Sequence, residues 1–202
     1  MTRAALSAVV NAAIFITTLA LLLRLFRQDG RWQFRRGLPA FRFFTVLSNA
    51  FCALSALAMA VCQVRGAAPP AVLTLKYLGT VSVTVTLLTV FAFLGPTQGG
   101  YRELLKGDNL YMHLIGPLLA ILSFCLLEKG SMSLGAALLG LVPVVLYGAL
   151  YLRKVVYAPE GSRWEDFYGF NRNGRWPVAF AAMVIGTALI CLAFWLVPGR
   201  IL

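Results

Sequence analysis

Six long apolar runs constrain this chain more than any other feature of its sequence. Each run is close to the about 20 residues that an α-helix needs to cross the hydrocarbon core of a bilayer. The short segments between them carry charged residues, glycine and proline, which end helices. The sequence therefore predicts an all-α membrane protein, with six transmembrane helices in one bundle and a single domain over residues 1–202. The predicted spans are residues 4–23, 43–61, 72–94, 110–127, 134–152 and 178–197.

The composition excludes a soluble fold. Hydrophobic residues make up 60% of the chain and charged residues 12%, and the mean hydropathy is +0.81. A soluble domain has about 45–50% apolar and about 25% charged residues. With half the usual charge, this chain cannot cover a water-facing surface. A soluble domain, a disordered chain and a disulfide scaffold are all excluded, and the bilayer is the main solvent.

The net charge of +11 would suggest nucleic acid as a partner in a soluble protein. Here the charges lie between apolar runs, so they indicate membrane topology and anionic lipid headgroups, and no nucleic acid is expected. The loops after the first, third and fifth runs carry six, two and five Lys and Arg residues. The positive-inside rule therefore places these three loops in the cytoplasm and both termini outside. The opposite side carries Arg3, Arg65, Lys76, Lys129 and Arg200, and Lys76 is expected to extend outward from its span.

The chain offers few ligands for a metal or a cofactor. It has one His, and its four Cys are isolated within apolar runs without a CxxC or Cys/His spacing. No cofactor-binding motif is visible, so we expect neither a cofactor nor a metal site. Nothing in the sequence indicates an oligomeric state.

His113 is the only His, and it lies close to the start of the fourth run. Ionisable residues inside membrane segments usually face the bundle interior or a wet cavity, and a neutral imidazole can act there as a base. Asn109 lies four residues earlier on the same helix face and could orient the ring; Asp108 and a backbone carbonyl are the other candidate partners. The alternative is an interfacial His that bonds to headgroups or to a carbonyl group.

Thr45 lies at the start of the second run, which enters the membrane from the same side as the fourth run. Counting spans therefore places Thr45 and His113 in one leaflet at nearly the same depth. Ser48 and Asn49 follow on the same helix face. A hydroxyl beside an imidazole is the minimal nucleophile–base pair for acyl transfer, and Asn49 or backbone N–H groups could supply an oxyanion site. The alternative is a Thr bonded to its own helix backbone.

Other polar residues are candidates for supporting or substrate-binding roles. Thr and Ser residues in the third run are typical of close helix packing, and their alternative is to line a cavity. The loop between the fifth and sixth runs is rich in aromatic and basic residues, which suits either an anchor at headgroup depth or a lid over the site. Pro117 and Pro143 are expected to kink their helices. The supporting candidates are Arg42, Ser48, Asn49, Thr86, Thr89, Asn109, Trp164, Asp166, Tyr168 and Asn171.

The string Phe41–Asn49 resembles the F-T-x-x-S-N signature of a bacterial six-span membrane protein family related to the animal androgen-induced and androgen-dependent membrane proteins. The resemblance extends over nearly the whole chain, through residues 81–96, 109–117 and 155–171. The animal relatives are threonine hydrolases that cleave fatty acid esters of hydroxy fatty acids. The resemblance implies that Thr45 is the nucleophile and His113 the essential histidine, in an integral protein of the bacterial inner membrane.

Two functions follow from these observations. The first is a hydrolase of lipid esters, with membrane lipids as surroundings and a lipid ester as substrate. The second is a lipid-binding protein without enzymatic activity or a small transporter, whose pathway the polar residues of the spans would line. A purely structural membrane protein, whose polar side chains only pack helices, is a third interpretation.

Overall fold

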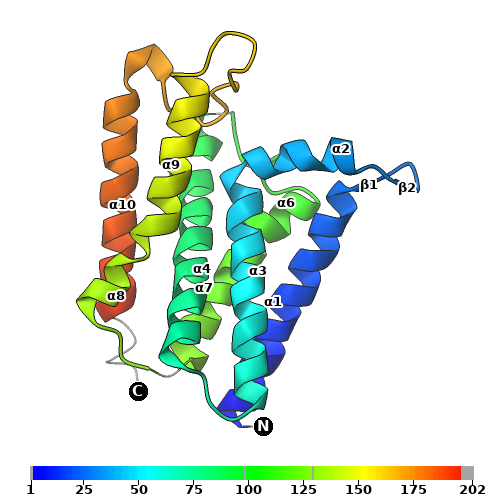
Figure 1. Ribbon diagram of the computed structural model, residues 1–202, viewed down its shortest axis with the longest axis vertical. Coiled ribbons are helices and arrows are strands. Elements are labelled where there is room, and N and C mark those ends of the chain that lie inside the picture. The colour runs from blue at the N-terminus through cyan, green and yellow to red at the C-terminus, as the bar shows by residue number, and fades with distance from the viewer. Residues whose placement is uncertain (1, 98, 129, 197–202) are drawn as a thin grey trace.

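The computed structural model describes residues 2–97, 99–128 and 130–196, and it is a bundle of six long helical segments (Figure 1). The predicted all-α architecture is confirmed, and each segment is long and apolar enough to cross a membrane. Predicted and observed boundaries differ by a few residues at most, and Val197 lies outside the described residues. The six segments are Arg3–Leu25, Phe44–Val64, Pro70–Thr97, Asp108–Leu127, Leu134–Val155 and Trp176–Leu196.

Several segments combine more than one element. The first and second are α1 (Arg3–Leu25) and α3 (Phe44–Val64), and the last is α10 (Trp176–Leu196). The third segment consists of α4 (Pro70–Thr89), η2 (Val90–Leu94) and α5 (Gly95–Thr97). The fourth consists of α6 (Asp108–Leu110), η3 (Tyr111–Ile115) and α7 (Gly116–Leu127). The fifth consists of α8 (Leu134–Leu138) and α9 (Leu141–Val155). The connections contain β1 (Arg27–Gln28), β2 (Arg31–Trp32), α2 (Phe34–Gly37), η1 (Leu38–Arg42) and η4 (Arg172–Gly174).

The bundle has two unequal parts. Helices α1, α3, α4 and α7 pack closely on one another, whereas α8, α9 and α10 pack mainly against each other and reach the rest through α4 (Figure 1). Helices α3 and α4 approach closely because Gly79 faces the backbone of Cys52 and the Ser55 hydroxyl, where a Cβ atom would have no room. The boundary between the two parts is where a cavity can form.

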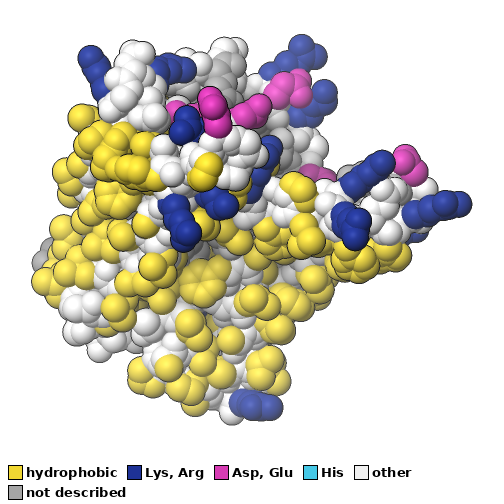
Figure 2. All heavy atoms as spheres, turned by 45° about the horizontal axis from the view of Figure 1, so that its top comes forward, with side chains coloured by type: hydrophobic (Ala, Val, Ile, Leu, Met, Phe, Trp, Pro, Cys, Tyr) yellow, Lys and Arg dark blue, Asp and Glu magenta, His cyan; other side chains and the backbone are white. Residues whose placement is uncertain are grey.

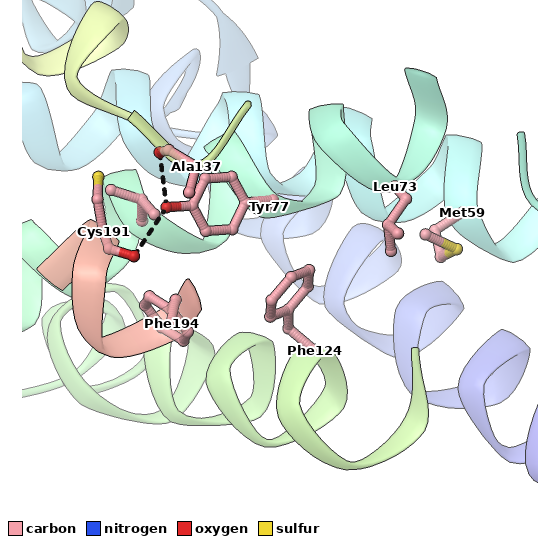
Figure 3. Close-up of a cluster of buried hydrophobic side chains, with 8 residues drawn as sticks. Met59, Leu73, Tyr77, Phe124, Ala137, Cys191 and Phe194 are labelled. Carbon is pink, nitrogen blue, oxygen red and sulfur yellow. Dashed lines mark hydrogen bonds between the residues drawn. The ribbon is translucent and has the colours of Figure 1, made fainter. Parts of the chain in front are cut away.

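An aromatic cluster joins the two parts near the end of the bundle where α1 begins. The Tyr77 hydroxyl of α4 donates to the carbonyl oxygen of Ala137 at 2.8 Å and lies 3.5 Å from that of Cys191 (Figure 3). The rings of Phe124 and Phe194 pack against Tyr77 with centroids 5.5 and 6.1 Å away. Because each buried polar atom of Tyr77 is bonded, this cluster closes the lower part of the bundle without an unsatisfied group.

Two of the helical segments contain a π-helical turn at the same sequence pattern. Residues 90–96 read VFAFLGP and residues 111–117 read YMHLIGP, and the first five residues of each string are π-helical. Proline removes a backbone hydrogen bond and its ring crowds the preceding turn, so the helix widens just before it. Before Pro117, for which a kink was predicted, the structure has a π-helical turn, and His113 lies within it. The fifth segment is interrupted between α8 and α9, just before Pro143.

The loops after the first, third and fifth segments lie together at one end of the bundle, which we call the loop end (Figure 1). Lys and Arg side chains gather at this end, and hydrophobic side chains cover the flanks below (Figure 2). The three basic loops thus share one side of the molecule, as the charge pattern predicts. Of the charges assigned to the opposite side, Lys129 and Arg200 lie outside the described residues.

One of those opposite-side charges is buried, contrary to the prediction. Lys76 does not extend outward: its side chain is 0% exposed inside the bundle. It lies in the same region as Glu128, which is 4% exposed and accepts hydrogen bonds at one carboxylate oxygen. The donors to this oxygen are Ser7 at 3.3 Å, Asn11 at 2.6 Å and Ser123 at 2.6 Å. We call these five residues the opposite-end cluster. The ammonium group thus stays inside the bundle and does not reach the membrane surface.

Candidate active site

Thr45 and His113 meet at the loop end. Thr45 is the second residue of α3 and His113 lies in the π-helical turn η3, and their Oγ1 and Nε2 atoms are 3.4 Å apart. The predicted approach of the two side chains is confirmed. The imidazole is buried, with 7% of the residue exposed, and Thr45 is half-buried. The distance is slightly longer than an ordinary hydrogen bond, as is common for such pairs without a bound substrate.

A loop carbonyl, rather than Asn109, orients the imidazole. His113 Nδ1 lies 2.6 Å from the carbonyl oxygen of Leu104. A carbonyl can only accept, so Nδ1 carries the proton and Nε2 of the neutral ring presents its lone pair to Thr45. Of the three partners that the sequence left open, the carbonyl is therefore the one observed: Asn109 is exposed and donates to the carbonyl of Glu103, and Asp108 pairs with Arg24 at 3.0 Å. The π-helical turn between Asn109 and His113 changes the angle between their side chains, so they no longer share a face.

Asn49 and Ser48 hold Thr45 from below. The Asn49 amide donates to the carbonyl of Thr45 at 2.8 Å and to that of Met112 at 3.0 Å, which connects α3 to the turn that carries His113. Both amide hydrogens are therefore used, and Asn49 cannot supply the predicted oxyanion site. The Ser48 hydroxyl also lies against the Thr45 carbonyl, at 3.1 Å, and is 2.8 Å from the Thr86 hydroxyl. These side chains position the nucleophile–base pair.

A cavity of about 440 Å³ lies beside Thr45, at the boundary between the two parts of the bundle. Helices α4, α9 and α10 supply most of its wall, and Thr45 lies at its loop end. Thr86 and Thr89 line it, as one interpretation of the third run predicted. His113 is not among the lining residues, so Thr45 stands between the imidazole and the cavity. The remaining lining is almost entirely apolar, which suits a hydrocarbon chain.

The loop between α9 and α10 covers the cavity. Tyr168 and Phe170 line its mouth, and the Tyr168 hydroxyl accepts the backbone N–H of Phe44 at 3.0 Å. Asp166 shapes this loop from within, because its carboxylate accepts the Tyr151 hydroxyl at 3.0 Å and the backbone N–H groups of Phe170 and Asn171. Of the two interpretations of this loop, an anchor or a lid, the position of Tyr168 and Phe170 at the cavity favours the lid, and Asp166 holds the shape of the loop without reaching the cavity.

The remaining candidates of the lid and of α3 are structural supports. The Arg42 guanidinium lies over the rings of Phe43 and Phe167, at 4.9 and 5.7 Å, and its carbonyl accepts the Tyr147 hydroxyl. The backbone N–H of Trp164 donates to the carbonyl of Lys154. None of Arg42, Trp164 and Asn171 lines the described cavity. Arg42 and Trp164 connect the lid to the start of α3 and to α9, whereas the backbone N–H of Asn171 bonds within the lid, to Asp166.

Tyr168 keeps its proton across neutral pH. Burial raises the pKa of its hydroxyl, against smaller opposing effects from the Phe44 N–H, from Tyr147 and from Thr45. A protonated phenol that already accepts one backbone N–H still has one hydrogen to donate. Tyr168 is therefore a hydrogen-bond donor close to the Thr45 hydroxyl.

Sequence reasoning missed several of the residues that build this site. Leu104 acts through its backbone, for which a side-chain pattern carries no signal. Tyr147 and Gly186 line the cavity from α9 and α10, and only their place on one helix face distinguishes them in the sequence. The repeated Gly-Pro pattern after residues 90–94 and 111–115 was a usable signal for the two π-helical turns.

The chemistry available here is that of a hydroxyl, an imidazole and a phenol. Within residues 2–97, 99–128 and 130–196, no group of three His, Cys, Asp or Glu side chains could hold a metal ion. Comparisons with protein-family models, curated proteins and solved structures found no match to this chain. What this site does must therefore be argued from its geometry.

Proposed function

We propose that this protein is an integral membrane hydrolase of lipid esters, with Thr45 as nucleophile and His113 as general base. The observation that carries the proposal is the alignment of three features: a carbonyl-oriented imidazole, a hydroxyl 3.4 Å from its free nitrogen, and an apolar cavity on the other side of that hydroxyl. The resemblance of residues 41–49 to the threonine hydrolases supports the same assignment of Thr45 and His113. By the same resemblance, we place the protein in the bacterial inner membrane.

In the proposed mechanism, His113 Nε2 takes the proton of the Thr45 hydroxyl while Oγ1 attacks the ester carbonyl carbon. The tetrahedral intermediate collapses when the imidazolium returns this proton to the leaving alkoxide, and the acyl group remains on Thr45. Nε2 then takes a proton from a water molecule, which attacks the acyl carbonyl. Collapse of the second intermediate returns the proton to Thr45 Oγ1 and releases the fatty acid.

Tyr168 is the candidate for stabilising the oxyanion. Its hydroxyl lies at the first turn of α3, where it accepts the Phe44 N–H, and its own hydrogen can point toward an oxygen bound beside Thr45. The positive end of the α3 dipole adds to this effect. The carbonyl of Leu104 stabilises an imidazolium less than a carboxylate would, so we expect a slow enzyme.

The substrate enters from the membrane. Its acyl chain occupies the cavity between α4, α9 and α10, and its ester group lies at the loop end near headgroup depth. The cavity lining offers few polar partners, so recognition depends on the apolar chain. The partners are thus membrane lipids and a lipid-ester substrate.

The cavity also supports a second candidate function, which is lipid binding without chemistry. A lipid-binding protein or small transporter needs the cavity but not the Thr45–His113 pair. This alternative predicts that ligand uptake persists after both side chains are removed and that no ester is turned over in the unmodified protein.

The test is hydrolysis of long-chain esters by purified protein in lipid nanodiscs, together with labelling by a fluorophosphonate probe. Thr45→Val removes the hydroxyl at nearly constant volume and should abolish turnover and labelling, whereas Thr45→Ser should retain both. Mass spectrometry of the labelled wild type should locate the adduct on the peptide that contains Thr45.

The matched control is Thr74→Val. Thr74 is a half-buried threonine of α4, as Thr45 is of α3, and its hydroxyl donates to the Pro70 carbonyl outside the cavity wall. This variant should hydrolyse esters at the wild-type rate. If Thr45→Val and the wild type turn over and label alike, the proposal is wrong.

A further inference from the structure

We infer that the cavity beside Thr45 limits the length of the acyl chain that can bind. The reason is that Gly186 keeps the middle of the cavity open and Ile190 forms the floor of the cavity. The inference rests on the proposed function only in placing the acyl carbonyl at Thr45. The length limit itself is a property of binding, so it can be measured without turnover.

The cavity is elongated along α10. The helix presents one face to it, with the cavity-lining residues Ala179, Ala182, Met183, Gly186, Thr187 and Ile190. At about 1.5 Å per residue, the distance from Ala179 to Ile190 is roughly 16 Å along the helix axis. Because α10 begins at the loop end with Trp176, this depth runs from the level of Thr45 toward the middle of the membrane.

The floor of the cavity is fixed by packing. Ile190 lines the cavity and also packs against the buried hydrophobic cluster that contains Tyr77, Phe124 and Phe194. Figure 3 shows this cluster. Beside it, Gly140 approaches the Cys191 sulfur so closely that a Cβ atom would have no room, so α10 cannot shift toward the chain before α9. A close-packed floor does not yield to an extra methylene group without cost.

The middle of the cavity is open because residue 186 has no side chain. A Cβ atom built on Gly186 would meet no atom within 4 Å, although this residue lies in the wall. The contrast is Gly148 of α9, also in the wall, where a Cβ atom would collide with Met183 and crowd Phe180. Gly148 therefore serves helix packing, whereas Gly186 borders free space that a ligand can use.

The deep half of the cavity accepts only apolar groups. Among the described residues, Thr187 supplies a hydroxyl to this part of the wall. This hydroxyl donates to the Met183 carbonyl at 2.7 Å, so its hydrogen is not available to a ligand. Val85 and Val144 supply the facing wall. A polar group placed there would lose its hydrogen bonds to water without replacement. The ligand class is thus a single hydrocarbon chain whose polar end stays at Thr45.

The experiment measures binding and hydrolysis along a series of straight-chain ligands. Unesterified fatty acids of increasing length compete with a fluorescent fatty acid for purified protein in nanodiscs, and nitrophenyl esters of the same lengths report turnover. In the wild type, affinity should rise by roughly fourfold per methylene group and then level off at the floor.

Two substitutions should move this plateau in opposite directions. Gly186→Leu fills the open middle, so affinity should level off at a shorter chain and long esters should be lost first. Ile190→Ala removes the floor side chain, so the plateau should move to a longer chain. The matched control is Gly135→Leu in α8, which adds the same side chain outside the cavity wall and should leave the plateau in place.

The outcomes separate this inference from the proposed function. If the plateau moves as described but the wild type hydrolyses no ester, the length limit holds and the hydrolase proposal fails. If esters are hydrolysed but Gly186→Leu and Ile190→Ala both keep the wild-type plateau, the length limit is overturned and the hydrolase proposal stands. Should Gly186→Leu fail to fold, Gly186→Ala and Ile190→Ala provide the same comparison with smaller shifts.

Discussion

Two polar clusters lie at opposite ends of this bundle, and they use similar side chains differently. At the loop end, Thr45 is held through its carbonyl by Ser48 and Asn49, which leaves its hydroxyl between His113 and a cavity. In the opposite-end cluster, the Glu128 carboxylate accepts three donors, and none of the five members lines the described cavity. At the loop end, the hydrogen bonds leave the Thr45 hydroxyl accessible from the cavity. In the opposite-end cluster, they surround the Glu128 carboxylate.

The opposite-end cluster is organised around charge. Lys76 and Glu128 are both buried, near the start of α4 and at the end of α7. Among the described residues, the Lys76 Nζ atom and the second Glu128 oxygen make no hydrogen bond. A buried charge is tolerated only when an opposite charge or polar groups compensate it. The comparison indicates that this cluster stabilises the fold and that the loop-end cluster carries the chemistry.

The largest effect on activity should come from His113→Gln. Loss of a general base costs roughly a hundred- to ten-thousandfold in turnover, whereas the folded state should lose little stability because a polar side chain remains near the Leu104 carbonyl. Ester turnover and thermal unfolding in detergent measure the two effects. Met112→Leu, a buried change in the same π-helical turn, is the control and should retain turnover. Equal turnover in His113→Gln and wild type would contradict the division of roles.

The reverse pattern is expected for Lys76→Met and Glu128→Gln. Each change leaves one buried charge uncompensated and should destabilise the fold by about 3–5 kcal/mol, while the surviving folded protein keeps its turnover per molecule. The double variant should lose clearly less than the sum of the single variants, because no unpaired charge remains. Denaturant unfolding of the four proteins measures this coupling. Additive losses would show that the two charges do not compensate one another.

Asn49→Ala should affect both properties, since Asn49 belongs to the loop-end cluster but acts through backbone carbonyls. Removing its amide leaves the carbonyls of Thr45 and Met112 unpaired, which should cost about 1–3 kcal/mol of stability. Turnover should also fall, because Met112 precedes His113 and the two helices lose a connection. Asn49→Asp offers acceptors in place of donors and should not rescue either property. A loss of stability with unchanged turnover would remove Asn49 from the positioning role.

The fold and the candidate site could be predicted from the sequence only where apolar runs or side-chain patterns determine them. The spans and the shared depth of Thr45 and His113 follow from apolar run lengths and from counting, and both agree with the structure. The sequence left the partner of the imidazole open among Asn109, Asp108 and a carbonyl, and it could not single out Leu104, because any loop residue carries a carbonyl group. Asn109 failed because the prediction assumed a regular α-helix at a π-helical turn. The burial of Lys76 could not be predicted, because it depends on how α4 packs against helices that are far away in sequence.

The smallest effect is expected for Tyr168→Phe, and it tests whether the lid takes part in the chemistry. One neutral hydrogen bond contributes about 0.5–1.5 kcal/mol, which corresponds to roughly a two- to tenfold loss of turnover. Because burial raises the pKa of Tyr168 above the ordinary value of about 10, the wild-type phenol stays a donor throughout neutral pH. The ratio of wild-type to variant turnover should therefore be constant between about pH 6 and pH 9. Tyr147→Phe removes a neighbouring hydroxyl that donates to the Arg42 carbonyl and should leave that ratio near one. If Tyr168→Phe changes ligand affinity but not the rate at saturation, the phenol only closes the cavity, and the chemistry of the loop end reduces to Thr45 and His113.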